Sequence, residues 1–395
     1  MAARRAVVVG AGIGGLTAAA ALCERGWRTT VLERAPTLEP VGAGIALAPN
    51  AQRCLDTLGG DRRTGDRVRA MASFHGSAGL RLPGGRWISR SSQAAAAERF
   101  GGPVVVVHRA DVVALLTGLL PAGTLRTGVP ALSVRPGGGA EPAVVGTADG
   151  ELEADLVVAA DGIHSGVRRQ LFPRHPGPRY TGSTSWRAVV EPPAEPFEPH
   201  ETWGRGRLWG SIPLADGRVY CYATAAVPAG GSEPDERDAL RRLFGSWHHP
   251  VPALIDAMGP GTVLRHDIHS AAAPLPAHHV GRIVLIGDAA HAMPPNLGQG
   301  GCQAVEDAVV LAHLAGPGDA ETDLDAALAA HTAQRLPRTT AVVRRSERIA
   351  RLTALRSVPA VAARTALFAA AGRLAPDLAL RGLDGIADWS PPAAR

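Results

Sequence analysis

Residues 6–34 read AVVVGAGIGGLTAAAALCERGWRTTVLER, and this stretch decides the fold. Its first apolar run, residues 6–9, is too short for anything but a buried strand, and residues 16–22 follow at helical spacing. A second apolar run ends on Glu33, about twenty residues after the glycines. Strand, glycine turn, helix and strand with a terminal acid are the arrangement that dinucleotide sites use.

The glycines and the acid of this stretch each have a physical role in such a site. Gly10 permits the tight turn, Gly12 lets backbone amides approach a pyrophosphate, and Gly15 lets the helix lie close to the sheet. The helix N-terminus then faces the phosphates with free N–H groups and a partial positive charge. Glu33 can accept hydrogen bonds from a ribose hydroxyl. These residues predict a bound dinucleotide, with an ordinary strand–helix–strand turn as the alternative.

The composition is that of a globular protein with more than one domain. The chain has 395 residues, 46% hydrophobic and 19% charged, which is enough for two or more sizeable cores. The net charge of +5 is small, and the basic residues, all arginine, are scattered, so no nucleic-acid surface is indicated. Lysine is absent, which excludes a mechanism that needs a Schiff-base or catalytic lysine.

The cysteines and the apolar runs favour a cytoplasmic, reducing compartment. Cys23, Cys54, Cys221 and Cys302 have no paired spacing, so we expect neither a zinc site nor a disulfide framework. Two arginines precede the first apolar run, but the glycine turn occupies the place where a signal peptide would be cleaved. No segment has the roughly 20 uninterrupted apolar residues of a membrane span, so no stable membrane association is expected.

The segments after Glu33 continue the pattern of strands and helices. Glycines in residues 41–50 would let the backbone pass close to a flat ligand, with a structural loop as the alternative. Residues 68–88 are expected to form two or three antiparallel strands. A later strand leads through Arg109 into a helix for which Asp111 is the expected N-cap. At that junction the Arg109 guanidinium can reach a phosphate, or it can be a surface residue.

Two acidic residues follow buried strands later in the chain. Asp161 and Asp288 both come at the end of an apolar run, where an α/β fold presents polar groups to a ligand. A helix cap is the alternative for Asp161, whereas Asp288 is expected to meet a ribose or ribityl hydroxyl. The glycine-rich loop 293–301 then leads into a helix from Cys302, which predicts a second cradle for an anion or a polar edge.

Between residues 180 and 266 the alternation of helices and strands gives way to strand-like runs. Five of the seven tryptophans lie in this and the earlier strand-rich region: Trp87, Trp186, Trp203, Trp209 and Trp247. The region therefore predicts a second, sheet-based domain inserted into the first. Residues 326–380 are helical by pattern, with breaks expected at Pro337 and Pro359.

The complete pattern predicts an α/β fold with three parts. A Rossmann-like cofactor-binding domain carries an inserted, mainly antiparallel β-sheet domain and is followed by a C-terminal helical segment. The expected boundaries are 1–67, 100–178 and 276–330 for the first domain, 68–99 and 179–275 for the sheet domain, and 331–395 for the helices.

Three separated stretches together resemble the motifs of a known family. Residues 10–33, 161–168 and 287–301 are similar to the glycine-rich, DG and GD motifs of class A flavoprotein monooxygenases, the p-hydroxybenzoate hydroxylase-like family. Val41-Gly42-Ala43-Gly44-Ile45 and residues 294–306 look closest to its salicylate hydroxylase, urate hydroxylase and zeaxanthin epoxidase branch. The resemblance covers nearly the whole chain, and the three motifs in this order are specific.

The resemblance implies FAD in the Rossmann-like domain, with NADPH or NADH as a transient reductant. The chain has no second GxGxxG, in agreement with the family's transient use of the nicotinamide cofactor. The loop 298–302 would present amides to the pyrimidine edge of the flavin and stabilise negative charge on the reduced ring. By matching position, the implied cofactor-binding residues are Gly12, Gly14, Gly15, Glu33, Arg34, Ala46, Arg109, Asp161, Asp288, Gly298, Gly300, Gly301 and Cys302.

The implied chemistry is flavin reduction by NAD(P)H, reaction with O₂ to a flavin C4a-hydroperoxide, and oxygen transfer to an electron-rich, aromatic or polyketide-like small molecule. An apolar pocket that excludes water should lie between the sheet domain and the flavin. Tyr220 matches a substrate-side tyrosine of the urate-hydroxylating relatives, and Leu208 stands where some relatives carry a substrate-clamping arginine, which argues against an anionic substrate. The expected pocket residues are Arg207, Trp209, Tyr220, Tyr222, Pro294 and Pro295.

Other functions are compatible with the same cofactor. Epoxidation of a double bond would use the same intermediate, and a flavin reductase or dehydrogenase would not oxygenate at all. A non-catalytic FAD-binding protein is a further alternative. A flavin halogenase is excluded, because it needs a lysine and a WxWxIP motif, whereas Leu208 and Gly210 precede Ile212 here. No residue is assigned as a general base, and His291 is expected to support the GD motif. The enzyme is expected to be a monomer or a homodimer.

Overall fold

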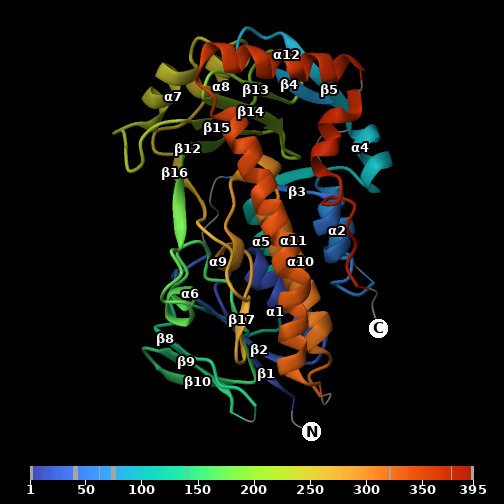
Figure 1. The fold of residues 1–395 in the computed structure, drawn as a ribbon, viewed down its shortest axis with the longest axis vertical. Coiled ribbons are helices and arrows are strands. Elements are labelled where there is room, and N and C mark those ends of the chain that lie inside the picture. Colours follow the sequence, from blue (N-terminus) through green and yellow to red (C-terminus); the bar gives the residue numbers. More distant parts are fainter. Residues whose placement is uncertain are drawn as a thin grey trace.

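The computed structural model describes residues 3–392, except 39–42, 62, 73–76, 140, 320–321 and 375. Val41 and Gly42, which belong to one of the sequence motifs that resemble the family, lie outside the described residues. Figure 1 shows an elongated molecule with a sheet at each end and the long helix α11 (Leu324–Thr353) running between them. The α/β fold class is confirmed, because helices and two large sheets build the molecule.

A six-stranded sheet contains the first strand of the chain. Its order is β17-β18-β11-β1-β2-β7, and all neighbours are parallel except the β17–β18 pair. Because the carboxyl ends of parallel strands meet at one edge, Glu33, Asp161 and Asp288 are brought to the same edge. The strands are β1 (Arg5–Val9), β2 (Arg28–Glu33), β7 (Leu125–Thr127), β11 (Leu156–Ala159), β17 (His279–Val280) and β18 (Ile283–Leu285).

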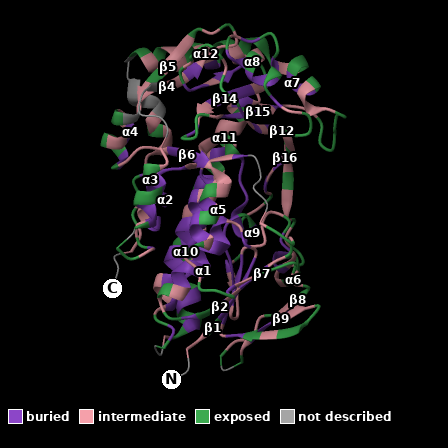
Figure 2. Ribbon diagram, turned by 180° about the vertical axis from the view of Figure 1, so that it is seen from behind, coloured by how far each residue is buried: buried purple, intermediate pink, exposed green. Residues whose placement is uncertain are grey.

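Helices α1 (Ile13–Glu24) and α10 (Gly300–Ala315) cover one face of this sheet, and nearly all of their residues are buried (Figure 2). Alanines 18–21 make α1 thin enough for α10 to pack closely against it. The other face packs against a small antiparallel sheet and α6 (Gly166–Leu171). That small sheet consists of β8 (Ser133–Arg135), β9 (Ala143–Thr147) and β10 (Gly150–Ala154).

A seven-stranded sheet lies at the opposite end of the molecule (Figure 1). Its order is β16-β12-β15-β14-β13-β4-β5, and every neighbouring pair is antiparallel except β4–β13. Helices α7 (Glu236–Phe244) and α8 (Val251–Asp256) close one face with an apolar core. The strands are β4 (Ser77–Arg81), β5 (Trp87–Ser92), β12 (Pro178–Val190), β13 (His200–Trp203), β14 (Arg207–Pro213), β15 (Val219–Ala225) and β16 (Leu264–Ala271).

A short two-stranded ladder lies between the two large sheets. Strand β3 (Gly44–Leu47) pairs antiparallel with β6 (Val105–His108), and β6 continues directly into α5 (Arg109–Thr117). The helix begins at Arg109 with His108 at the N-cap position, so the expectation that Asp111 caps it was wrong. The strand runs into the helix without a loop, so Asp111 is the third residue of the helix and lies within its first turn.

Five further short helical segments lie in the described part of the chain before α10. They are α2 (Pro49–Leu55), α3 (Thr64–Ala70), α4 (Gln93–Phe100), α9 (Asp288–His291) and the 3-10 turn η1 (Pro295–Leu297). Val68 lies in α3, so the antiparallel strands expected over residues 68–88 begin only with β4. Among the described residues, no helix is both long enough and apolar enough to cross a membrane.

The C-terminal segment is helical, but its first helix is longer than the sequence pattern indicates. Helix α11 continues through Pro337, where a break was expected. Arg335 and Arg338, on either side of the proline, are both ion-paired to the buried Glu306 of α10, which holds the two turns in line. After α11 come α12 (Val358–Leu374), with Pro359 in its first turn, and the 3-10 segment η2 (Pro376–Leu383).

Candidate active site

The glycine turn after β1 brings three segments into close contact. Gly10 has a φ of +103°, and a Cβ atom there would lie 2.4 Å from the Ala160 carbonyl oxygen. A Cβ atom at Gly15 would lie 2.0 Å from the Gly10 carbonyl oxygen, and one at Gly14 would lie 2.9 Å from the Ala304 Cβ atom. Gly10, Gly14 and Gly15 are therefore required for the packing of strand, helix and α10.

Gly12 has a different environment from the other glycines of this turn. Among the described residues, a Cβ atom at Gly12 would have no neighbour within 4 Å, so this residue faces open space there. Gly12 is also the N-cap of α1, and no side chain caps that helix. Its first N–H groups therefore point into the open space with the positive end of the helix dipole behind them. This cradle fits an anionic group such as a pyrophosphate.

Glu33 closes one side of the cradle. Its carboxylate accepts hydrogen bonds from the amides of Ala11 at 2.8 Å and Ala35 at 2.9 Å, which fixes the end of β2 against the glycine turn. Each carboxylate oxygen keeps lone pairs for a further donor. Arg34, the next residue, is exposed.

Arg109 at the start of α5 and Asp288 at the start of α9 come from different elements, but they lie close enough for their charges to interact. Burial lowers the pKa of Arg109, as does the charge of Arg187, while the charges of Asp288 and Glu33 oppose this shift. Burial raises the pKa of Asp288 against the charges of His291, Arg168 and Arg109, yet its side chain is exposed. The carboxylate is therefore accessible from outside the chain at a place where the surrounding protein reduces its hydration.

The loop before α10 completes this side of the site. Gly298, at φ +62°, packs against Ala46, since a Cβ atom there would lie 3.3 Å from the Ala46 Cβ atom. A Cβ atom at Gly301 would lie 2.7 Å from the Ile45 Cδ1 atom, and one at Gly300 would lie 3.9 Å from Asp288 Oδ1. Strand β3, the start of α10 and Asp288 are thus brought together.

Cys302, within the first turn of α10, is a packing residue. Its Sγ atom accepts a hydrogen bond from the Ala48 amide at 3.4 Å and lies 3.5 Å from the Gly298 carbonyl oxygen. Burial raises the pKa of the Cys302 thiol to about 12, so the sulfur stays protonated. The thiol ties α10 to the end of β3 and is not suited to act as a nucleophile.

The DG motif contributes one unpaired acceptor. Asp161 Oδ2 accepts a hydrogen bond from the Val167 amide at 3.1 Å, while Oδ1 is buried without a partner in the described part of the chain. Ser165, not Asp161, is the N-cap of α6. Arg168 is buried and donates to the carbonyl oxygens of Ala289 and Ile163, which holds this motif against α9.

The three strand-end motifs fit the cofactor that the sequence resemblance implies. The open cradle at Gly12 suits a pyrophosphate, and the exposed Asp288, next to the start of α10, can accept a hydrogen bond from a ribityl hydroxyl. The unpaired Asp161 Oδ1 offers an acceptor beside them. A dinucleotide such as FAD would therefore find acceptors, amide donors and space in one connected region.

A buried network that the sequence did not reveal supports this region from behind. His291 Nε2 lies 2.5 Å from Asp307 Oδ2, as expected for a residue that supports the GD motif, and Arg335 pairs with both Asp307 and Glu306. Burial alone would raise the pKa of Asp307, but His291 and Arg335 hold it well below its usual range. The network locks the GD motif to α10 and α11.

The face of the seven-stranded sheet that α7 and α8 leave uncovered, here called the free face, meets β3 at Tyr220 and, farther along, packs against α11 and α12. Tyr220 and Tyr222 of β15 share this face, and the Tyr220 ring packs so closely on Gly44 of β3 that a Cβ atom there would lie 2.5 Å from ring atom Cδ1. Tyr222 covers Gly210 and donates a hydrogen bond to Glu201 Oε1 at 2.8 Å. Burial raises the pKa of Tyr220 to about 12.

Arg207 and Trp209 are not brought together with the two tyrosines. On β14, Gly210 is opposite Tyr222, so the alternation of side chains sends Trp209 to the other face. Trp209 is fully buried in the core beneath α7 and α8, and Arg207 donates to the Leu243 carbonyl oxygen of α7. The structure therefore removes these two residues from the pocket wall.

Pro294 and Pro295 lie on the loop between α9 and α10. Pro294 is buried, and its carbonyl oxygen accepts a hydrogen bond from Ser346 of α11 at 2.6 Å. Pro295 is exposed at the start of η1. The loop is thus fixed to α11 while one proline remains accessible.

Arg187 was missed by the sequence analysis. It lies on β12 directly opposite Tyr222 of β15, on the face that carries both tyrosines. His266 of β16 shares this face and lies opposite Ser185. The alternation within 185–190 could have identified Arg187, but only with the register between β12 and β15 in hand.

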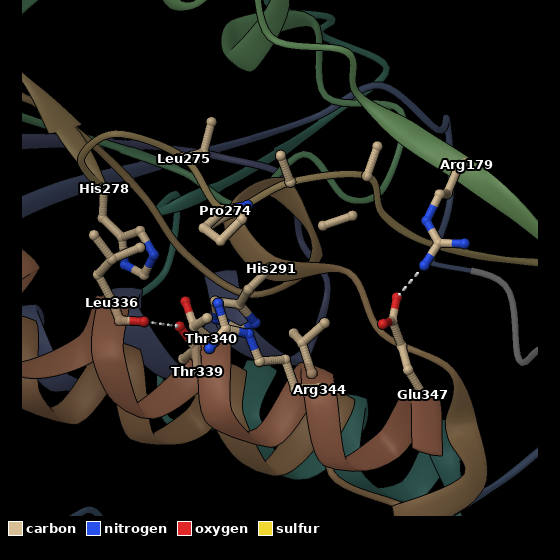
Figure 3. A pocket seen from close by; sticks show the side chains of 15 residues that line it. Arg179, Pro274, Leu275, His278, His291, Leu336, Thr339, Thr340, Arg344 and Glu347 are labelled. Carbon is tan, nitrogen blue, oxygen red and sulfur yellow. Dashed lines mark hydrogen bonds and ion pairs between the residues drawn. The ribbon is translucent and has the colours of Figure 1, made fainter. Parts of the chain in front are cut away.

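A separate pocket of about 140 Å³ lies between α9, α11 and the segment after β16 (Figure 3). His278 and His291 lie at its inner end, and the Arg179–Glu347 ion pair lies at another part of its wall. None of the residues predicted to bind cofactor or substrate lines it. We assign it no part in the reaction.

Comparison with known proteins agrees with this geometry. The sequence model of the FAD binding domain family matches residues 4–346. The aurachin C monooxygenase/isomerase of Stigmatella aurantiaca is 40% identical over 350 residues, 88% of either chain. The FAD-dependent urate hydroxylase of Klebsiella pneumoniae is 35% identical over 346 residues, 85% of this chain and 86% of the relative.

Solved structures agree as well. HpxO of Klebsiella pneumoniae in complex with FAD and uric acid superposes with a TM-score of 0.85 at 30% identity, covering 98% of this chain and 96% of the other. The chain belongs to the FAD binding domain family and is a class A flavoprotein monooxygenase.

Proposed function

We propose that this monooxygenase uses NAD(P)H and O₂ to hydroxylate an electron-rich aromatic small molecule. The observation that carries the proposal is the contact of Tyr220 with Gly44. This contact joins the free face of the seven-stranded sheet to β3, which itself packs against the start of α10 beside Asp288. The substrate face and the cofactor cradle would then be two walls of one space.

Each wall has a distinct task in this proposal. Gly12 and the start of α1 would hold the pyrophosphate, Glu33 a ribose hydroxyl and Asp288 the ribityl chain. The amides at the start of α10 would stabilise negative charge at the edge of the flavin ring. When bound, FAD would supply electron transfer from NAD(P)H and the activation of O₂.

The other wall would orient the substrate and exclude water. Tyr220 and Tyr222 would place an aromatic ring against the flavin, since aromatic faces stack or meet edge to face. Their rings, 5.4 Å apart, form a continuous apolar surface next to Val189 and Leu264. No buried cysteine or histidine is assigned a proton-transfer role. We infer that residues 68–99 and 179–275 form the substrate domain over the cofactor domain.

The activities of the relatives support hydroxylation of nitrogen- or oxygen-substituted rings. The relatives include a urate hydroxylase, a 3-amino-4-hydroxybenzoate 2-monooxygenase and an aurachin C monooxygenase/isomerase. Epoxidation and simple flavin reduction are the competing outcomes for this chain. The product, rather than the cofactor, distinguishes the three.

The test is a single turnover with isotopically labelled O₂. The FAD-loaded enzyme is reduced anaerobically with NADPH or NADH and then mixed with labelled O₂ and uric acid, 3-amino-4-hydroxybenzoate or salicylate. We expect a ring-hydroxylated product that carries one labelled oxygen atom, detected by mass spectrometry. Oxidation of the nicotinamide cofactor with no labelled organic product from any of these compounds would support the non-oxygenating alternative.

A further inference from the structure

Arg187 is an arginine in an unusual position. It is half-buried on β12, next to the edge strand β16, on the face with Tyr220 and Tyr222, yet within the described chain its guanidinium has neither a hydrogen bond nor an ion pair. A guanidinium without an acceptor loses hydration without compensation when it is partly buried. Placing a guanidinium in such a position costs free energy unless a ligand supplies a hydrogen-bond acceptor.

Other arginines of the same sheet show the ordinary solution. Arg207 donates to a carbonyl oxygen of α7, and Arg265 lies next to Asp267 at 3.3 Å. Both point toward partners that the fold itself supplies. Arg187 differs because it faces the space between the sheet and the cofactor cradle, where the fold offers it no acceptor.

The charges around Arg187 leave this space positive. The positive charge of Arg187 acts on Arg109, on His266 and on Tyr220, and it also acts on Asp288. Asp288 is the only acidic group among these neighbours, and it would be engaged by a cofactor hydroxyl. Arg187 and Arg109, at the start of α5, are thus close enough for their positive charges to repel each other.

The two tyrosines show where on this face a ligand could form hydrogen bonds. The Tyr222 hydroxyl donates to Glu201, so it is already engaged. Among the described residues, none accepts a hydrogen bond from the Tyr220 hydroxyl. Among the described residues of this face, Arg187 and Tyr220 therefore have donors without a partner, as does the exposed ring of His266 on the edge strand β16.

We propose that Arg187, with the Tyr220 hydroxyl beside it, forms a subsite for a negatively charged oxygen of the substrate, a carboxylate or an ionised phenol. The assignment rests on the proposed function, since it places this oxygen on the ring that is hydroxylated. It replaces the expectation drawn from Leu208: the arginine missing from β14 is supplied by β12. A guanidinium pairs with such an oxygen in a charge-assisted, directional hydrogen bond.

The test measures binding without turnover, so that it is independent of oxygenation. Benzoate is titrated into the FAD-loaded enzyme, and the change in flavin absorbance gives its Kd; benzamide, a neutral compound of the same shape, is titrated in parallel. We expect benzoate to bind more tightly than benzamide. In Arg187→Met benzoate should bind at least about tenfold more weakly, with benzamide unchanged, because a charged hydrogen bond is lost.

Two further variants separate this role from a structural one. Arg187→Lys should recover part of the affinity for benzoate, because the charge returns without the planar fork. Arg207→Met, on β14, two strands away in the same sheet and on the opposite face, should bind benzoate as the wild type does. The proposal is overturned if the wild type shows no preference for benzoate, if Arg187→Met keeps it, or if that variant instead loses FAD or raises only the KM for NAD(P)H.

Discussion

In the proposed function the cofactor cradle and the free face of the seven-stranded sheet are two walls of one space, but they are built in different ways. The cradle consists mainly of backbone, namely the turns at Gly10 and Gly12 and the N-termini of helices. Its acidic side chains come from residues at or just after the ends of strands. The sheet face consists of side chains, namely Arg187, Tyr220 and Tyr222, whose direction depends on strand register. The first kind of wall suits one constant cofactor, and the second can change with the substrate.

This difference explains what could be read from the sequence. The glycines and acids of the cradle lie next to the strands that position them, so local spacing is sufficient to identify them. Arg207 and Trp209 were assigned to the wrong face, because β14 meets β15 with Gly210 opposite Tyr222. That pairing joins segments whose register no local pattern determines.

The buried network behind the cradle was also beyond the sequence. Arg335 lies 28 residues after Asp307, and only the packing of α11 on α10 brings their side chains to 2.7 Å. The same ion pairs explain why α11 continues through Pro337. Tertiary contacts here outweigh a local rule that normally ends a helix.

The largest expected effect concerns the face of the sheet that is turned away from the cradle. Trp209→Ala should lower the free energy of unfolding by about 3–5 kcal/mol, because a fully buried indole is removed from the core beneath α7 and α8. Denaturant unfolding of the FAD-free protein measures this loss. Weakened substrate binding with unchanged stability would instead return Trp209 to the pocket.

The next effect tests the cradle. Asp288→Ala should weaken FAD binding by about 10- to 100-fold, the value of one or more hydrogen bonds to a charged acceptor, while the protein keeps its fold. FAD titration followed by flavin fluorescence measures the affinity, and circular dichroism checks the fold. Asp384→Ala, an exposed acid on the C-terminal segment, is a suitable control. Unchanged FAD affinity in Asp288→Ala would contradict its proposed contact.

A smaller effect is expected at Tyr222. Tyr222→Phe removes the hydrogen bond to Glu201 Oε1, and this carboxylate then keeps only Trp203 as a side-chain donor. Since burial already raises the pKa of Glu201, the loss should favour its protonation and cost about 1–3 kcal/mol of stability. The denaturant midpoints of the wild type and the variant measure this loss of stability. An equal midpoint would show that the hydrogen bond contributes nothing.

The smallest effect on stability is expected at Tyr220, although its effect on turnover should be clear. Tyr220→Phe keeps the ring on Gly44 and should change the free energy of unfolding by less than about 1 kcal/mol, because no described residue accepts a hydrogen bond from this hydroxyl. Substrate-stimulated NAD(P)H oxidation should fall while FAD stays bound. Kinetics equal to those of the wild type would remove Tyr220 from the substrate wall.

The central claim is that segments after β1, β11 and β18 converge on one cofactor. The most direct measurement is the titration of the FAD-free protein with FAD, read as flavin bound per chain. The account predicts saturation at one FAD per chain, with the bound flavin absorbing in the visible range after gel filtration. Protein that remains colourless after reconstitution with excess FAD would contradict it.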